Sequence, residues 1–128
     1  MQNYFSKAEA ENIQWEVYGP EGGYISVVAG DPGNSNVLYA GTIYGPGLLK
    51  STDQGASWSS VNTDALRDTH IYDILVDATD SSIYLATESQ GVLKSTNGGK
   101  NWTPFNEGFE LGQEGQPPLV CILYLWSL

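Results

Sequence analysis

The stretch Ser51-Thr52-Asp53-Gln54-Gly55-Ala56-Ser57-Trp58 returns as Ser95-Thr96-Asn97-Gly98-Gly99-Lys100-Asn101-Trp102, an interval of 44 residues from Ser51 to Ser95. The residues before it return as well, since Gly47-Leu48-Leu49-Lys50 is matched by Gly91-Val92-Leu93-Lys94. Seven of the twelve paired positions are identical. A period of this length is typical of architectures in which each repeat is one four-stranded unit. The sequence therefore predicts at least two consecutive β-units.

Short alternating or β-branched segments occupy matching places around both copies, and such segments indicate strands. We expect strands over residues 24–29, 37–42, 48–51 and 58–61 in the first unit, and over 71–76, 83–87, 91–94 and 102–105 in the second. The small and β-branched composition of residues 24–29 predicts a strand buried on both faces. Residues 63–68 are expected to be a connector with at most one helical turn. Residues 13–18 alternate apolar and polar side chains and predict a leading strand.

These elements define the expected organisation of the chain. Residues 1–12 are a polar leader, 13–69 hold the leading strand and the first unit, and 70–113 hold the second. Residues 114–128 match only the opening strand of a further unit, so we expect the chain to stop inside a truncated third unit. The fold class is therefore predicted to be all-β.

Composition limits the functions that this chain can have. The net charge is -10, with five Lys and Arg residues, so no basic surface is available for nucleic acid or for an anionic membrane. No apolar run is long enough for membrane insertion, and the first residues do not resemble a signal peptide. Cys121 and His70 are the only cysteine and histidine, and we expect both to be structural. No metal site and no cofactor are predicted.

Five aspartates lie close together in the sequence, and they allow a calcium site or a pair of catalytic carboxylates as alternatives to a structural role. However, one of them, Asp77, falls at the place that Asp31 occupies in the first unit. An Asp followed by turn residues accepts hydrogen bonds from nearby backbone N–H groups, so Asp31 and Asp77 are expected to be turn residues. We favour structural roles for the whole group: Asp64, Asp68, Asp73, Asp77 and Asp80.

The repeated motif itself is expected to join the third and fourth strands of each unit. Its Asp53 can accept hydrogen bonds from backbone N–H groups two residues on, and Asn97 can form the same turn with weaker neutral bonds. Its glycine, Gly55 in the first copy and Gly99 in the second, permits a positive φ, and its Trp is expected to fold back over the turn and bury a large indole. The motif is therefore interpreted as a structural staple, made by Ser51, Asp53, Gly55 and Trp58 and again by Ser95, Asn97, Gly99 and Trp102.

The pattern Ser-x-Asp-x-Gly-x-x-Trp resembles the Asp-box, or BNR repeat, of β-propellers such as sialidases, xyloglucan-active glycoside hydrolases, sortilin-type receptors and photosystem II assembly factors. The resemblance extends over roughly residues 15–125. It implies four-stranded antiparallel propeller blades, about two of them plus the start of a third, with the motif on the outer rim of each blade. It also suggests a secreted or periplasmic location. Because two blades leave their flanking faces uncovered, further blades or self-association are expected.

Two activities of the resembling families can be compared residue by residue. Sialidases hold a carboxylate with three arginines, whereas this chain has only Arg67. Xyloglucan-active relatives carry a catalytic Asp directly after the Tyr-Ala-x-Thr segment of the first blade. That place is taken here by Ile43, and in the second unit by Glu88, which remains a catalytic candidate.

We therefore expect a non-catalytic scaffold or binding module that presents residues 42–47 and 87–91 to a protein or glycan partner. The alternative is the N-terminal part of a carbohydrate-active glycoside hydrolase whose catalytic residues lie elsewhere.

Overall fold

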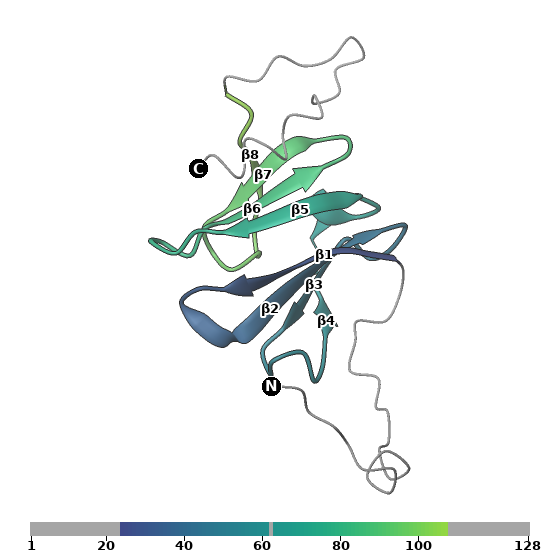
Figure 1. Cartoon of the computed structure of the whole chain (residues 1–128). Coiled ribbons are helices and arrows are strands. Elements are labelled where there is room, and N and C mark those ends of the chain that lie inside the picture. Colours follow the sequence, from purple (N-terminus) through teal and green to yellow (C-terminus); the bar gives the residue numbers. More distant parts are fainter. Residues whose placement is uncertain (1–23, 62, 108–128) are drawn as a thin grey trace, which may run out of the picture.

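The protein forms two four-stranded antiparallel sheets that follow one another along the chain, with strand orders β1-β2-β3-β4 and β5-β6-β7-β8 (Figure 1). The structure is a computed structural model, and it describes residues 24–61 and 63–107. This confirms the predicted all-β fold of four-stranded units. The strands are β1 (Tyr24–Asp31), β2 (Asn34–Ile43), β3 (Leu48–Ser51), β4 (Ser59–Ser60), β5 (Ile71–Val76), β6 (Ile83–Thr87), β7 (Gly91–Ser95) and β8 (Thr103–Pro104).

Tight turns connect the strands of each sheet. In the β1–β2 turn, Asp31 Oδ1 accepts a hydrogen bond from the backbone N–H of Gly33 at 2.8 Å. In the β5–β6 turn, Asp77 Oδ1 accepts one from the N–H of Thr79 at 2.7 Å. Both contacts span two residues, the spacing of an Asx turn.

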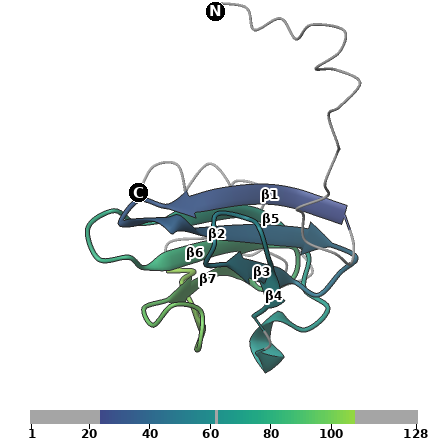
Figure 2. The same cartoon turned by 90° about the horizontal axis from the view of Figure 1, so that it is seen from below.

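The principal core lies between the two sheets, which pack side by side with β1 next to β5 (Figures 1 and 2). Ser26 of β1 strengthens this contact, because its Oγ donates to the carbonyl of Gly41 at 3.0 Å and also to the carbonyl of Ile71 in the other sheet. The core is a single cluster of buried side chains from both sheets and the connector: Val37, Tyr39, Leu48, Leu66, Ile71, Ile74, Val76, Ile83, Leu85 and Leu93.

Strand β1 is buried on one face only, so the predicted burial of both faces is wrong. Val27 and Ala29 pack against the core, whereas Tyr24 and Val28 on β1 are 76% and 56% exposed. The position of Val28 corresponds to Ile74 in β5, which is only 6% exposed because the first sheet covers it. A β-branched pattern indicates that a strand is suited to burial, but it does not indicate whether a second sheet covers that strand.

The outer strands are shorter than predicted. β4 and β8 each contain two residues instead of four, although the N–H of Val61 donates to Leu48 O at 2.8 Å and that of Phe105 donates to Val92 O at 2.7 Å. These bonds continue the antiparallel pairing by one residue beyond each strand. The connector contains the one predicted helical turn, η1 (Asp64–Leu66).

Several predicted features fall outside the described residues. They are the leader, the leading strand over 13–18, the third unit over 114–128 and Cys121. The unit boundaries at 69/70 and 113/114 accordingly stay predictions. Among the residues that the structure describes, no helix has the length and apolar character needed to cross a membrane.

Candidate functional site

Two loops with matching places in the two sheets lie at one end of the molecule. They follow Ile43 at the end of β2 and Thr87 at the end of β6. The connector between the sheets runs beside both loops. It lines a hollow together with Gly45 and Pro46 of the first loop, and the Gln90 side chain of the second loop donates to Ala65 O at 2.8 Å and to Thr69 Oγ1 at 3.0 Å. We call the surface formed by Tyr44, Asp68, His70, Tyr72 and Glu88 the loop-end site.

A threonine fixes the base of each loop. Thr42 Oγ1 donates to Gly47 O at 3.0 Å and accepts from Gly47 N at 2.9 Å. Thr87 Oγ1 donates to Gly91 O at 2.8 Å and accepts from Gln90 N at 3.1 Å. Both hydroxyls use their donor and acceptor capacity within the loop, so the two loops have defined shapes before any ligand binds.

Glu88 and His70 form the polar centre of the loop-end site. His70 Nδ1 lies 2.8 Å from Glu88 Oε2, and the Glu88 side chain is 48% exposed. The Tyr44 ring contacts the imidazole edge to face, with ring centroids 4.6 Å apart. Burial raises the pKa of the Tyr72 phenol, and the Glu88 carboxylate raises it further by its charge and its hydrogen bond. Glu88 is therefore held by two neighbours yet remains accessible to solvent.

Two residues of this site have an unfavourable backbone conformation. Tyr44 has φ 56° and Asp68 has φ 55°, in the left-handed region that favours glycine. Both line the same hollow, together with Gly45 and His70. The left-handed conformation costs a residue such as tyrosine roughly 1–2 kcal/mol, whereas aspartate adopts it more readily. Gln54 and Ser81, in turns away from this site, also have a positive φ. Tyr44 is also 76% exposed, so little packing explains why a tyrosine holds this position.

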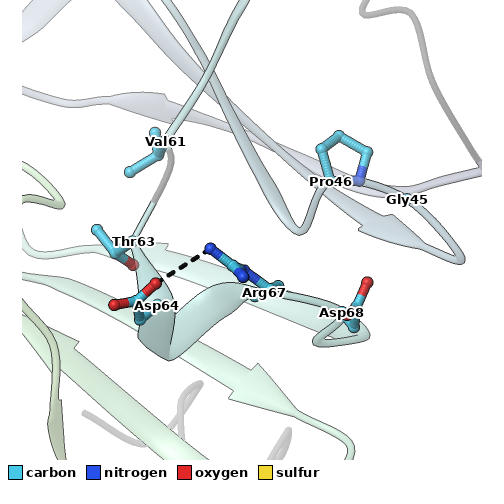
Figure 3. Close-up of a pocket in the computed structure, with 7 residues that line it drawn as sticks. All are labelled: Gly45, Pro46, Val61, Thr63, Asp64, Arg67 and Asp68. Atoms are coloured by element: carbon cyan, nitrogen blue, oxygen red, sulfur yellow. Dashed lines mark hydrogen bonds and ion pairs between the residues drawn. The ribbon is translucent and has the colours of Figure 1, made fainter.

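A second hollow of about 280 Å³ adjoins the first and shares Gly45 and Asp68 with it (Figure 3). Gly45 and Pro46 form one side, and the connector residues Thr63, Asp64, Arg67 and Asp68 form the other. Arg67 Nη2 lies 3.2 Å from Asp64 Oδ1, but both side chains are largely exposed. An exposed ion pair contributes little energy, so Arg67 and Asp64 remain able to bind a polar ligand.

The five aspartates that are close in sequence do not gather at one place in the structure. Asp77 and Asp80 lie in the β5–β6 turn, where their carboxylates accept bonds from Thr79 and Ser82, at the far end of the sheet from the connector. Asp73 lies within β5, where Oδ1 accepts from Ile74 N at 2.9 Å. Within residues 24–61 and 63–107, no three metal-ligating side chains come together. The structure therefore does not assemble the calcium site that the sequence left open.

The motif turns lie at the opposite end of the sheets from the loop-end site, since β3 and β7 separate them. Ser51 Oγ donates to Asp53 Oδ1 and accepts from Gly55 N, both at 2.8 Å. Asp53 Oδ1 accepts from Ser57 N at 2.8 Å, which is four residues on and not two as expected. Hydrogen bonds from Ser57, first of all from its hydroxyl, lower the pKa of Asp53 to about 2. Ser51 Oγ thus takes the N–H of Gly55, which is two residues beyond Asp53, and the Asp53 carboxylate binds the N–H of Ser57.

The second motif turn repeats this geometry with an amide. Asn97 Oδ1 accepts from Ser95 Oγ at 3.0 Å and from Asn101 N at 2.9 Å, and Ser95 Oγ accepts from Gly99 N at 2.9 Å. Gly55 and Gly99 have φ of 90° and 92°.

Trp58 and Trp102 are both half-buried. Trp58 Nε1 donates to Gly55 O at 3.1 Å, whereas Trp102 packs against the core between the sheets.

The structure places Ile43 half-buried at the end of β2, opposite Tyr24. It has no ionisable group, and Glu88 occupies the matching place in the second sheet. The sequence analysis did not identify Tyr72 as a site residue, and it considered Tyr44 only as part of the loop over residues 42–47 and Asp68 only as part of the aspartate group. Tyr44 precedes a Gly-Pro-Gly turn, a signal for an exposed loop, but the strain at Tyr44 and Asp68 cannot be read from the residue types.

No family model matches the chain. Curated relatives are xyloglucanases: Xgh74A of Acetivibrio thermocellus is 32% identical over 95 residues, and the enzyme of Hypocrea jecorina is 36% identical over 97 residues. These matches cover 56% and 69% of the chain, which spans only about a tenth of each relative, 11% in both cases.

Crystal structures of GH74 enzymes have the same fold. The Niastella koreensis enzyme is 33% identical with a TM-score of 0.54, covering 72% of this chain and 16% of that one. An ancestral GH74 enzyme is 27% identical with a TM-score of 0.58, covering 70% and 13%. The relatives are β-propeller enzymes, so the two sheets correspond to propeller blades. The finer assignment to the Asp-box repeat stays a prediction.

Proposed function

We propose that this chain is part of a β-propeller glycoside hydrolase acting on xyloglucan, and that its loop-end site binds the glucan chain. The observation that carries this proposal is the similarity of this chain to xyloglucanases, at 32% and 36% identity over 56% and 69% of its length. A purely non-catalytic scaffold, the first expectation from the sequence, has less support because the similar proteins are hydrolases. The loop-end site supplies the chemistry for binding.

A neutral polysaccharide needs two kinds of contact. Its sugar rings have an apolar C–H face that packs on an exposed aromatic ring, and their hydroxyl edges need hydrogen-bond partners. Tyr44 offers an exposed ring that contacts His70, and the Glu88 carboxylate contacts the same imidazole. Arg67 and Asp64 extend the polar edge along the second hollow. A neutral polysaccharide does not require a positively charged binding surface, so the net charge of -10 is compatible with this ligand.

The role of Glu88 is binding, with the complete catalytic pair elsewhere in the protein. An inverting glycosidase needs a general acid and a general base about 6.5–9.5 Å apart. The position that carries an acid in the resembling enzymes is Ile43 here, so this blade supplies no carboxylate there. Glu88 is paired with His70 at 2.8 Å, which holds it as an oriented hydrogen-bond acceptor for sugar hydroxyls.

The test is binding and hydrolysis of xyloglucan by the intact protein, measured by affinity electrophoresis in polymer-containing gels and by release of reducing ends. Tyr44→Ala and Glu88→Gln should each weaken retardation by xyloglucan, by about 5- to 30-fold in Kd for a contact worth 1–2 kcal/mol. Tyr44→Phe should retain binding, because the ring is preserved. Asp80→Asn in the distant β5–β6 turn is the matched carboxylate control and should bind like the unmodified protein.

The outcomes separate the possible roles. Retardation without release of reducing ends would support glucan binding and contradict hydrolysis by this protein. Unchanged binding in both Tyr44→Ala and Glu88→Gln, with hydrolysis intact, would show that the glucan binds away from the loop end. Absence of both binding and hydrolysis would contradict the proposed function altogether.

A further inference from the structure

The motif turn of the second blade holds an asparagine where the first blade has an aspartate. Asn97 is followed by Gly98, and this is the only Asn-Gly pair in the sequence. Both residues are exposed. We propose that Asn97 deamidates spontaneously in the folded protein, and that the second turn thereby acquires the carboxylate that Asp53 provides in the first.

The reaction consumes only water. The backbone nitrogen of Gly98 attacks Cγ of Asn97, and a cyclic imide forms as the Cγ–Nδ2 bond breaks. Ammonia leaves with the proton that Gly98 N loses. Water then adds to the Cγ carbonyl and cleaves the new Cγ–N bond, which gives aspartate with the original backbone. Hydrolysis at the other ring carbonyl gives isoaspartate, with an extra methylene in the main chain.

The turn activates the carbonyl that is attacked. Asn97 Oδ1 accepts hydrogen bonds from Ser95 Oγ at 3.0 Å and from Asn101 N at 2.9 Å. Two fixed donors on a carbonyl oxygen stabilise the negative charge that develops there when a nucleophile adds, as in an oxyanion hole. Within the described ranges Nδ2 of Asn97 donates no hydrogen bond, so the leaving group is free to depart into solvent.

The attacking nitrogen is also accessible. Gly98 has no side chain and φ 72°, and the nearest heavy atom to the place of a Cβ is Lys50 Nζ at 3.8 Å. Its N–H has no hydrogen-bond acceptor among the described residues. The Lys50 ammonium favours the deprotonated amide that attacks, and later the new carboxylate, because an opposite charge nearby stabilises an anion.

The first blade shows that the product fits. Asp53 Oδ1 accepts bonds from Ser51 Oγ and Ser57 N, each at 2.8 Å, in the same turn geometry. A carboxylate at position 97 would replace two neutral bonds with stronger charge-assisted ones. Isoaspartate would instead lengthen a turn whose two glycines have φ of 72° and 92°, so the fold should favour the aspartate product.

The experiment is incubation of the intact protein at mildly alkaline pH, followed by peptide mapping with mass spectrometry that separates aspartate from isoaspartate. Asn101 lies in the same turn, is exposed and precedes Trp102, so it is the internal control and should stay unmodified. We expect Asn97 to convert at least as fast in the folded protein as in urea, with aspartate as the main product. Asn97→Asp serves as the chromatographic standard.

Two variants separate activation by the turn from the reactivity of the Asn-Gly pair alone. Lys50→Gln and Ser95→Ala should each slow conversion in the folded protein and leave the rate in urea unchanged. Asn97→Asp should also unfold at a higher temperature than the unmodified protein above pH 5. The proposal would be overturned if Asn97 deamidated more slowly in the folded protein than in urea, or if isoaspartate were the main product in the folded protein.

Discussion

Replacement of Gly41 by alanine tests the contact between the two blades most directly. A Cβ at this position would lie 2.7 Å from Ile71 Cγ2 and 2.9 Å from Val27 Cγ1. Both neighbours are β-branched side chains with stiff χ1 angles, and Ile71 is fully buried, so neither can move aside cheaply. Overpacking of a well-packed core costs about 1–3 kcal/mol, while Gly→Ala in a strand recovers roughly 0.5–1 kcal/mol. We expect a net loss of about 1–2 kcal/mol.

Gly30→Ala is the matched control. Gly30 lies in the neighbouring strand, and a Cβ there would meet only Leu38 Cδ2 at an ordinary 3.7 Å. This variant should be neutral or slightly more stable than the unmodified protein. Urea unfolding followed by tryptophan fluorescence measures both. For a domain of this size, a loss of 1 kcal/mol lowers Tm by about 4–8 °C.

A double variant sharpens the measurement. Val27→Ala removes one of the two clashing methyl groups, so Val27→Ala/Gly41→Ala should be more stable than the sum of the single effects. If Gly41→Ala unfolds at the same urea concentration as Gly30→Ala, the two sheets do not approach as closely as described, and the account of the core between them is wrong.

Three further outcomes are expected. Trp102→Ala should lower the free energy of unfolding by about 3–5 kcal/mol, and Trp58→Ala should lower it clearly less. The reason is that Trp102 packs against the core between the blades, while Trp58 lines a surface hollow with Leu38 and Gly55. Equal losses of stability in thermal melts would contradict this prediction. The pKa of Asp53 is lowered from 3.8 to about 2, so its contribution to stability is complete above pH 3.8 and is lost as the pH falls towards 2. Asp53→Asn should remove this part of the pH dependence of stability, measured by urea unfolding at several pH values. Tyr44→Gly should raise Tm relative to Tyr44→Ala, because glycine tolerates φ 56° and alanine does not; no difference would remove the strain argument for the loop-end site.

The two motif turns show how far residue types determine local structure. Serine, aspartate or asparagine, and glycine at fixed spacing predict a tight turn, since each residue supplies a defined donor, acceptor or φ. The prediction failed on the partner of Asp53, because Ser51 Oγ occupies the nearer backbone N–H and the carboxylate binds Ser57 N. Competition between two acceptors in one turn depends on distances that the sequence does not contain.

The loop-end site shows the opposite case. Glu88 was found by matching repeats, but its partner His70 precedes it by 18 residues and Tyr44 by 44 residues. These three side chains meet only because the β2–β3 loop, the start of β5 and the end of β6 come to the same end of the two packed sheets. The positive φ of Tyr44 and Asp68 likewise belongs to the folded loops, and the types of these two residues do not predict it.

By itself, the sequence determined the repeat, the four-stranded units, the all-β class and the turn residues, because hydrophobic periodicity and turn chemistry act over a few neighbouring residues. Only the tertiary structure decided which face of β1 is covered, which tryptophan packs between the blades, and which polar groups surround Glu88. Val28 and Ile74 occupy matching places in similar strands, yet one is 56% exposed and the other 6%. Burial is set by the neighbour that packs on a strand, and that neighbour lies far away in the chain.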